Sequence, residues 1–413
     1  KIVADYAKFA KQIGFENILA IPISGLKGDN ITAARTNTPW YKGPTLLAAL
    51  EGIDVFNDAA ALPVRYPVQM VVRPGTGTDF RGYAGRLASG MLSAQAQQRK
   101  SLRWATSSID SYGYMVAASM TKMVEEALGG EYTVTVNPYP QTTSATKAAM
   151  EDTAEIGYTA DIGMTQLYAG EGGFKDYNPA KGKLVHTWYA YPMESFMAVA
   201  TKDAGNFKCL KDFSGKPVFY TTAGFMNWLN FQRMYKALGY EFKHVQIDAK
   251  SNSDAMQAGT IVGSVAYTVS GRALAPYWKE TEVRTDVSVI NPCPDEIAKL
   301  KAAGMTITNV NPKDAFSKDV GVKEILGVPI LFAYNVTAAM PEDVVYKMLN
   351  AFYQNRDKLA SLDPGFSALA KDFVGMQAAG INANPTVPVH AGLAKFLKEH
   401  KAWNDKWTVA KSS

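Results

Sequence analysis

The chain has 413 residues, of which 47% are hydrophobic and 20% are charged. This composition excludes a disordered chain, and the length predicts roughly two to four domains. The net charge is +5, and the sequence has no dense Lys/Arg tract, so we expect no nucleic-acid partner. No apolar run approaches the roughly 18 residues of a membrane span, so we expect no direct membrane insertion.

Cysteine and histidine are scarce. The sequence has two cysteines, Cys209 and Cys293, and four histidines, none of them at the spacing of a metal site. We therefore expect no metal and no cofactor. We expect the two cysteines to be unpaired buried thiols. A disulfide remains the alternative, because sequence does not give the distance between their Cα atoms.

The N-terminal elements begin with a helix over residues 1–13, where apolar residues recur at helical spacing and Gly14 ends the run. Because the chain starts at Lys1 inside this pattern, we expect the beginning of the element to be missing. A buried strand follows over 18–23, and Thr45 is a plausible cap of a second helix. Alternating apolar and polar residues after position 60 predict the opening of a small β-barrel.

Three segments in order carry a resemblance: ISGLKGDN, PWYKGPTLLAAL and PVQMVVRP…DFRGYAGRLASG. They resemble the elongation-factor type of GTPase, in particular the GTPase subunit of sulfate adenylyltransferase. The resemblance covers about residues 1–90 and implies that Ser24, Gly25 and Leu26 form the last guanine-contacting loop. Neither the P-loop pattern GxxxxGK[ST] nor NKxD occurs in the sequence, although phosphate contacts supply most nucleotide affinity. We expect 1–58 to be a C-terminal GTPase-domain fragment and 59–90 the start of a β-barrel, without GTP binding.

Residues 91–100 form a junction. Ala94-Gln95-Ala96 has the small-x-small form of a signal-peptidase site, but the GTPase-like fragment stands where an apolar export segment belongs. We expect a chimera in which the exporting segment has been replaced. The alternative is an ordinary polar linker.

Strands and helices alternate from residue 97 onward, which predicts α/β architecture. We expect strands at 102–106, 132–136, 156–158, 197–200, 218–220, 262–269 and 330–337. We expect helices over 114–128 and 342–359 and after residues 142 and 224. Aromatic residues crowd 188–235, and we expect most of them to be core.

A hydroxyl-rich loop joins strand to helix at 107–108, 142–144 and 221–224. Helix N-termini bind anions through free N–H groups, and ligands of open α/β sheets lie beyond the strand ends. Together these loops predict an anion pocket that needs no cationic side chain. The alternative is that each Ser or Thr only caps its helix.

The order of six segments across 100–407 resembles the TAXI group of solute-binding proteins of TRAP transporters. The segments are WATSSIDSYGYMVAASM, TTSATKAAMEDTAEIGYTADIGM, LKDFSGKPVFYTTAGFMNW, MQAGTIVGSVAYTVSG, MPEDVVYKMLNAFYQN and VPVHAGLAKFLKEH. The resemblance implies a two-lobed, type II periplasmic-binding-protein fold, with lobe I at 101–200 and 328–413 and lobe II at 201–327. It also implies a periplasmic location, a small carboxylate ligand (an amino acid or organic acid) and TRAP membrane subunits as partners.

The resemblance implies ligand-binding roles for twelve residues: Ser107, Ser108, Tyr112, Thr142, Thr143, Ser144, Asp161, Thr221, Thr222, Gly224, Tyr267 and Ser270. Two positions depart from the family pattern, since Lys147 stands where Asn is common and Val262 where Asp is common. Lys147 would add a positive charge to the site. Arg272 is a candidate clamp for a carboxylate, with a solvated surface arginine as the alternative.

No nucleophile elbow and no catalytic set of Ser, His, Asp or Cys can be argued, so we expect no enzyme activity. His390 lies in the family's C-terminal segment and is expected to be structural. Two other functions remain open: a GTPase subunit of sulfate adenylyltransferase, and a periplasmic ligand-sensing protein.

Overall fold

The computed structural model describes residues 3, 6, 18–24, 27–33, 37–52, 68–72, 82–85, 99–109, 111–151 and 153–411, with the backbone alone for 68–72 and 82–85. Its contacts divide the chain into unit 1, residues 1–97, and unit 2, residues 98–413. Each unit is described by itself. Among the described residues, no helix is both long and apolar enough to cross a membrane.

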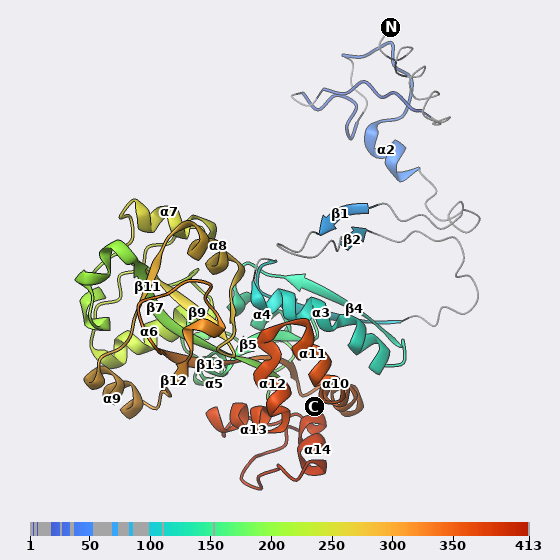
Figure 1. Ribbon diagram of the computed structural model, residues 1–413. Coiled ribbons are helices and arrows are strands. Elements are labelled where there is room, and N and C mark those ends of the chain that lie inside the picture. Colours follow the sequence, from blue (N-terminus) through green and yellow to red (C-terminus); the bar gives the residue numbers. More distant parts are fainter. Residues whose placement is uncertain are drawn as a thin grey trace. The chain divides into compact units, whose positions relative to one another are not determined.

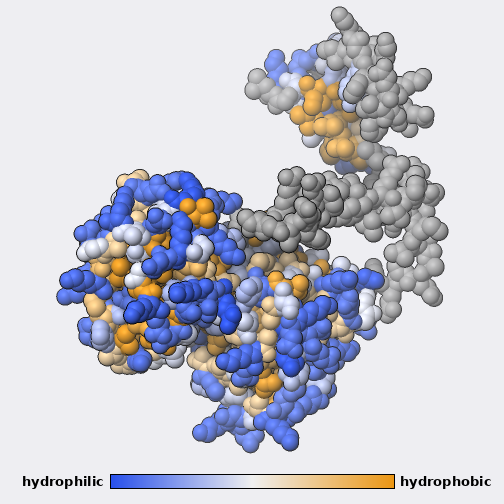
Figure 2. All heavy atoms as spheres, in the orientation of Figure 1, coloured by the Kyte–Doolittle hydropathy of each residue, from blue (hydrophilic) through white to orange (hydrophobic). Residues whose placement is uncertain are grey.

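Unit 1 has little packed interior in its described part. Helix α2 (Leu46–Glu51) is capped by Thr45, whose side chain accepts a hydrogen bond from the Ala48 N–H, but none of its residues is buried. Strands β1 (Val68–Val72) and β2 (Gly82–Gly85) pair antiparallel. The buried residues of the described part are Asp29 and Asn30, and Figure 2 shows hydrophobic side chains gathered at its surface.

Two long antiparallel strands organise unit 2. Strand β7 (Tyr189–Ala200) pairs with β13 (Ile325–Thr337) in the centre of a nine-stranded sheet. The last part of β13 pairs with β5 (Gly157–Ala160), whereas β7 pairs on its other side with β9 (Gly263–Val269). The two strands therefore run through both halves of the unit, which we call lobe I and lobe II (Figure 1).

Lobe I holds the elements before β7 and after β13. Strands β3 (Lys100–Thr106) and β4 (Tyr132–Pro138) are parallel and joined by α3 (Tyr112–Ala127). The sequence predicts these three elements well, because apolar runs and the Gly129-Gly130 stop mark them. The remaining elements are α4 (Thr142–Ala148), α5 (Asp161–Ala169), β6 (Leu184–Val185), α10 (Glu342–Gln354), α11 (Arg356–Leu362), α12 (Ser367–Lys371), α13 (Phe373–Ala383) and α14 (Ala391–Glu399).

Lobe II lies between β7 and β13 in sequence. It contains β8 (Val218–Phe219), α6 (Met226–Leu238), η4 (Ala249–Ser251), α7 (Asn252–Gln257), β10 (Ala273–Leu274), α8 (Pro276–Arg284), β11 (Val287–Ile290), α9 (Pro294–Ala302) and β12 (Thr308–Val310). Strand β8 runs parallel to β9, and β11 pairs antiparallel with β7. Short helices thus cover a sheet that lobe II shares with the long strands. Together the lobes form the predicted type II periplasmic-binding-protein fold.

Aromatic side chains fill the interior where the long strands meet lobe I. Trp104 packs edge-on against Tyr334 with ring centroids 5.0 Å apart, and Trp188 stacks on Tyr334 at 5.2 Å. All three are at most 2% exposed. The expectation that the aromatic run is mostly core is confirmed for Trp188, as it is for Tyr189, Tyr191, Phe219, Tyr220 and Phe231.

Two predicted elements were wrong in extent. The strand expected at 197–200 is only the end of β7. The sequence does not mark the earlier residues of β7 as a strand, because they include aromatic residues and lack the alternation of a half-buried strand. Burial on both faces removes that alternation. The helix expected at 342–359 is two helices, since the chain breaks at Asn355 between α10 and α11 while the apolar spacing continues.

The expectation of unpaired buried thiols was also wrong. Cys209 and Cys293 form a disulfide with their Cα atoms 5.3 Å apart, and neither residue is fully buried. The bridge joins the residue before η3 (Leu210–Phe213) to the residue before α9. The buried Glu296 lies beside it and accepts hydrogen bonds from the N–H groups of Leu210 and Lys211. These contacts fix two lobe II segments that are distant in sequence.

A buried carboxyl group lies on the shared strand β7. Glu194 is 2% exposed, and its Oε2 accepts hydrogen bonds from Thr268 Oγ1 at 2.7 Å and from the Gly271 N–H at 3.0 Å. Burial outweighs these bonds and raises the pKa of Glu194 to about 7. The group is therefore protonated in the folded protein at a pH where it is ionised in the unfolded chain.

This carboxyl group should make folding stability depend on pH. The folded pKa lies above the unfolded value, so the contribution of Glu194 falls as pH rises from about 4.5 to about 7, by on the order of 3 kcal/mol. We expect Glu194→Gln to remove this loss. The free energy of unfolding of the variant, relative to that of the wild type, should therefore be higher at pH 8 than at pH 4.5. Urea unfolding of both proteins across this range measures the difference, with the exposed Glu131→Gln as control. A constant difference between the proteins would contradict the assignment.

Candidate functional site

A small chamber lies between the lobes, beside the long strands, with a volume of about 10 Å³, which is room for about one water molecule. We call it the inner chamber. Its lining combines hydroxyl groups with apolar and aromatic side chains and includes no charged residue. The lining residues are Ser107, Ser111, Tyr112, Thr142, Tyr158, Met193, Phe225, Met226, Asn227, Tyr267 and Phe332.

A wider outer pocket adjoins the inner chamber, because Ser111, Phe225 and Tyr267 line both. Its volume is about 360 Å³. In contrast to the inner chamber, it presents charged groups. The lining is Ser108, Ser111, Thr221, Thr222, Phe225, Gln246, Ile247, Asp248, Ala249, Lys250, Tyr267, Pro276, Tyr277 and Glu280.

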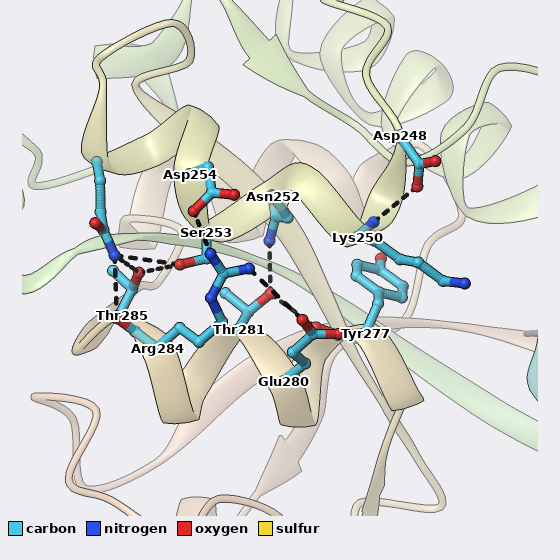
Figure 3. Close-up of polar contacts among 11 residues, drawn as sticks. Asp248, Lys250, Asn252, Ser253, Asp254, Tyr277, Glu280, Thr281, Arg284 and Thr285 are labelled. Atoms are coloured by element: carbon cyan, nitrogen blue, oxygen red, sulfur yellow. Dashed lines mark hydrogen bonds and ion pairs between the residues drawn. The ribbon is translucent and has the colours of Figure 1, made fainter.

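Polar contacts within lobe II hold the wall of the outer pocket (Figure 3). Arg284 on α8 forms ion pairs with Asp254 on α7 and, at 3.6 Å, with Glu280 on its own helix. Asn252 Nδ2 donates to Thr281 Oγ1 at 3.3 Å. These contacts tie α7, and with it the adjoining η4, to α8. They fix the spacing between the pocket residues of the η4 segment and those on α8.

The inner chamber receives the N-terminus of α3 from lobe I. Ser111 caps this helix by accepting from the Tyr114 N–H at 3.1 Å, and it also accepts from Ser107 Oγ at 2.8 Å. With two bonds accepted, the hydroxyl proton of Ser111 is available to an acceptor that the described residues do not supply. Ser111 thus acts as both a helix cap and a hydrogen-bond donor for the cavity.

Helix α6 brings a second N-terminus, from lobe II. Its cap residue Phe225 makes no side-chain bond to the first turn, so the first N–H groups of α6 have no capping acceptor. Met226 and Asn227 of that turn line the inner chamber. Two helices of 16 and 13 residues therefore direct the positive ends of their dipoles at one cavity. The electrostatic field there favours an anion.

Asn227 has an unusual environment in the inner chamber. It is 3% exposed, and its Nδ2 contacts Met193 Sδ at 3.5 Å. Its Oδ1 finds no hydrogen-bond donor among the described residues. A buried amide oxygen of this kind is destabilising unless something else supplies a donor.

The structure brings seven of the thirteen predicted residues to the two cavities. Ser107, Tyr112 and Thr142 line the inner chamber, Ser108, Thr221 and Thr222 line the outer pocket, and Tyr267 lines both. These residues come from four separate chain segments and both lobes. Thr143, Ser144, Asp161, Gly224, Ser270 and Arg272 line neither cavity.

Thr143 and Gly224 instead form a contact between the lobes. Thr143 Oγ1 donates to the Gly224 carbonyl oxygen at 3.1 Å. Gly224 has φ +87°, and a Cβ there would lie 2.7 Å from the Gln141 side chain. The positive φ therefore favours a glycine at this position.

The other residues outside the cavities have local partners. Asp161 Oδ1 accepts from the Ile162 N–H at 2.7 Å, and burial raises the pKa of Asp161 while Arg233 on α6 opposes the rise. Ser270 Oγ donates to the Gly365 carbonyl oxygen at 2.6 Å. Arg272 is exposed, as in the surface alternative. Lys147 adds no charge to either cavity, because its Nζ lies 4.7 Å from the ring centroid of Tyr177.

Sequence reasoning missed Ser111, Asn227 and the charged wall of the outer pocket. Ser111 precedes an apolar helical run, which is the pattern of a helix cap. The sequence instead predicts a helix start at Tyr114, two residues after the start of α3 at Tyr112. Asn227 carries no signal, because one amide within an aromatic-rich helix looks like any polar surface position. Of the aromatic candidates, Phe225 lines both cavities.

The predicted guanine loop lies mostly outside the described residues. Ser24 is described, and its Oγ accepts from the Lys27 N–H at 3.2 Å. Gly25 and Leu26 are outside the described residues, so the loop remains a prediction.

Ser111 should contribute to stability through its cap. We expect Ser111→Ala to lower the free energy of unfolding by about 1 kcal/mol, because the Tyr114 N–H loses its acceptor. Ser119→Ala, an exposed position on the same helix, should have a much smaller effect. Chemical denaturation of both variants measures the difference, and equal losses would contradict the capping role.

Curated relatives match only a short part of the chain. The bifunctional enzyme NodQ of Rhizobium meliloti is 52% identical over 93 residues, which are 22% of this chain and 14% of NodQ. Sulfate adenylyltransferase subunit 1 of Shewanella oneidensis is 48% identical over 92 residues, 22% of this chain and 19% of that protein. The chain thus spans less than a fifth of the length of these relatives. The predicted resemblance of its N-terminal part is confirmed.

Among solved structures, the periplasmic aliphatic sulphonate binding protein SsuA from Escherichia coli is similar with a TM-score of 0.37 and 15% sequence identity, covering 76% of this chain and 96% of SsuA. The model of the NMT1-like family matches residues 104–400, which is well over half of the chain. The match includes both lobes and every residue of the inner chamber. The chain therefore belongs to the NMT1-like family.

Proposed function

We propose that unit 2 is a solute-binding domain that captures a small carboxylate between its lobes. The observation that carries this proposal is the pair of adjoining cavities: the N-termini of α3 and α6 meet at the inner chamber, whose wall has no charged side chain, and the outer pocket supplies the volume for the rest of the ligand. A carboxylate there accepts hydrogen bonds from N–H groups of both helices and from Ser111. Its charge is balanced by dipoles rather than by a cation.

The wall chemistry favours binding over catalysis. The chamber offers hydroxyl, amide and aromatic groups, and it has no cysteine, histidine, lysine or carboxylate in its lining. Tyr112 donates its hydroxyl proton to Asp363, and Tyr158 shares a hydrogen bond with Tyr191. Burial raises the pKa of both Tyr112 and Tyr158. These groups therefore hold a ligand without exchanging protons with it.

The connection between the lobes suits ligand-dependent closure. Strands β7 and β13 link the lobes, and the Thr143–Gly224 contact joins them again at the first turn of α4, which holds Thr143. A ligand held by α3 and α6 at once adds interactions that exist only when the lobes are together. Binding therefore shifts the population toward the closed form.

A closed, loaded lobe pair is a suitable surface for a membrane partner. We propose that this partner is the membrane component of a transporter, of the TRAP type that the sequence resemblance implies, and that unit 2 works in the periplasm. The Cys209–Cys293 disulfide supports this location, because disulfides persist in oxidising compartments.

Thermal unfolding of the full chain tests the proposal. The unfolding temperature is measured at constant pH and salt, first without ligand and then with each member of a panel of amino, hydroxy and dicarboxylic acids. Chloride and GTP serve as controls. We expect at least one acid to stabilise the protein, by about 2.7 kcal/mol at 100 times its dissociation constant.

Two variants make this result specific to the inner chamber. Ser111→Ala should weaken the stabilisation by the active acid, because the carboxylate loses a donor, whereas Ser119→Ala should leave it unchanged. Stabilisation by GTP but by no acid would contradict the proposal. Equal weakening by the two variants would place the ligand elsewhere.

A further inference from the structure

A short turn of lobe I contacts both a residue of the inner chamber and lobe II. It consists of Asp363 and η6 (Pro364–Phe366), and we call residues 363–366 the strap. Asp363 Oδ1 accepts a hydrogen bond from the Gly365 N–H at 2.7 Å, and Gly365 and Phe366 are buried. The side chain of Asp363 therefore holds the backbone of the strap in its turn.

The strap is bonded to Tyr112, which lines the inner chamber. The Tyr112 hydroxyl donates to Asp363 Oδ1, the same atom that accepts from the Gly365 N–H. A Cβ at position 365 would overlap the Tyr112 hydroxyl, so the glycine leaves the space that this hydroxyl occupies. Asp363 itself lines neither cavity. Any effect of Asp363 on the chamber therefore passes through Tyr112.

The same strap is bonded to Ser270 of lobe II. Ser270 Oγ donates to the Gly365 carbonyl oxygen at 2.6 Å. Ser270 has φ +53°, a backbone conformation that residues other than glycine seldom adopt. Its N–H donates to the Pro192 carbonyl oxygen of β7 at 3.1 Å. The strap and β7 thus hold Ser270 from two sides in a conformation that serine does not favour by itself.

The turn at Ser270 continues to the shared strand β7. Gly271 also has a positive φ, of +65°, and its N–H donates to the buried Glu194 Oε2 at 3.0 Å. A shift of this turn would take a hydrogen bond from a buried carboxyl group, which is costly. The position of the turn is therefore tied to the strand that connects the lobes.

We propose that Asp363 is a positioning residue and that the strap links Tyr112 of lobe I to Ser270 of lobe II, so that the two move as one unit when the lobes close. Asp363 fixes the direction of the Tyr112 hydroxyl, and Gly365 fixes Ser270. The chamber wall then has its closed arrangement when the turn of lobe II is in place. This inference rests on the lobe closure of the proposed function and not on the identity of the ligand.

Hydrogen–deuterium exchange of the full chain, with no acid added, tests this link. Asp363→Leu has a similar size but no acceptor, so the Tyr112 hydroxyl and the Gly365 N–H both lose their partner. We expect exchange at 268–272 of lobe II to become about fivefold faster, the factor for the loss of roughly one hydrogen bond. Asp363→Asn keeps an acceptor oxygen and should exchange at close to the wild-type rate.

Ser361→Ala is the matched control. Ser361 is exposed, and its hydroxyl donates to the Asp357 carbonyl oxygen of its own helix at 3.0 Å. This variant should leave exchange at 268–272 unchanged. Helix α9 of lobe II should exchange at the wild-type rate in every variant, and circular dichroism verifies the fold of each.

Two further variants test the link from its two ends. Tyr112→Phe removes the donor to Asp363 and should speed exchange at 268–272, although the change is in lobe I. Ser270→Gly removes the hydroxyl, while glycine adopts the positive φ without strain, and should speed exchange at 363–366. The double variant should exchange no faster there than the faster single variant, because both changes release the same strap.

The outcomes distinguish this inference from the proposed function. Unchanged exchange at 268–272 in both Asp363→Leu and Tyr112→Phe would overturn the link and leave carboxylate binding standing, because no acid is present. Equal acceleration by Asp363→Asn and Asp363→Leu would overturn the role of the acceptor oxygen. Additive effects in the double variant would show two independent contacts and overturn the single unit. Failure of every acid to stabilise the chain overturns the proposed function and leaves the strap untouched.

Discussion

The pairing of β7 with β13 is the constraint on which the rest of unit 2 depends. Both strands belong to both lobes, so each lobe completes its sheet with residues that also connect it to the other. The interior aromatic cluster and the buried Glu194 lie on or against these strands. Because the strands fix where the lobes meet, they also fix where the N-termini of α3 and α6 meet. The site is a consequence of this connection.

In the proposed function, the inner chamber recognises charge without using charged side chains. A buried cation without its ligand carries a large desolvation penalty, whereas the partial charge of the free N–H groups at a helix N-terminus carries a smaller one. Ser111 adds a donor whose geometry is fixed because its oxygen already accepts two bonds. Asn227 Oδ1, by contrast, has no donor among the described residues.

Sequence reasoning predicted the architecture and the hydroxyl loops at 107–108 and 221–224 because these depend on local patterns: apolar runs, glycine stops and Ser or Thr before helices. It placed Ser107, Thr142 and Tyr267 at the cavities for this reason. The loop expected at 142–144 was wrong, because these residues form the first turn of α4. Sequence reasoning failed where the decisive contact joins distant segments. The disulfide between Cys209 and Cys293, the contact of Thr143 with Gly224 and the environment of Asn227 depend on tertiary packing, which leaves no mark in the neighbouring sequence.

The central claim is that one ligand is held by both lobes at the beginnings of α3 and α6. Hydrogen–deuterium exchange of the full chain, with and without an acid that stabilises it, tests this most directly, because it reports each helix separately. The account predicts slower exchange at both 107–117 and 222–231 when the acid is present, with residues 18–52 of unit 1 unchanged. Slower exchange in only one of these two segments, or only within unit 1, would contradict it.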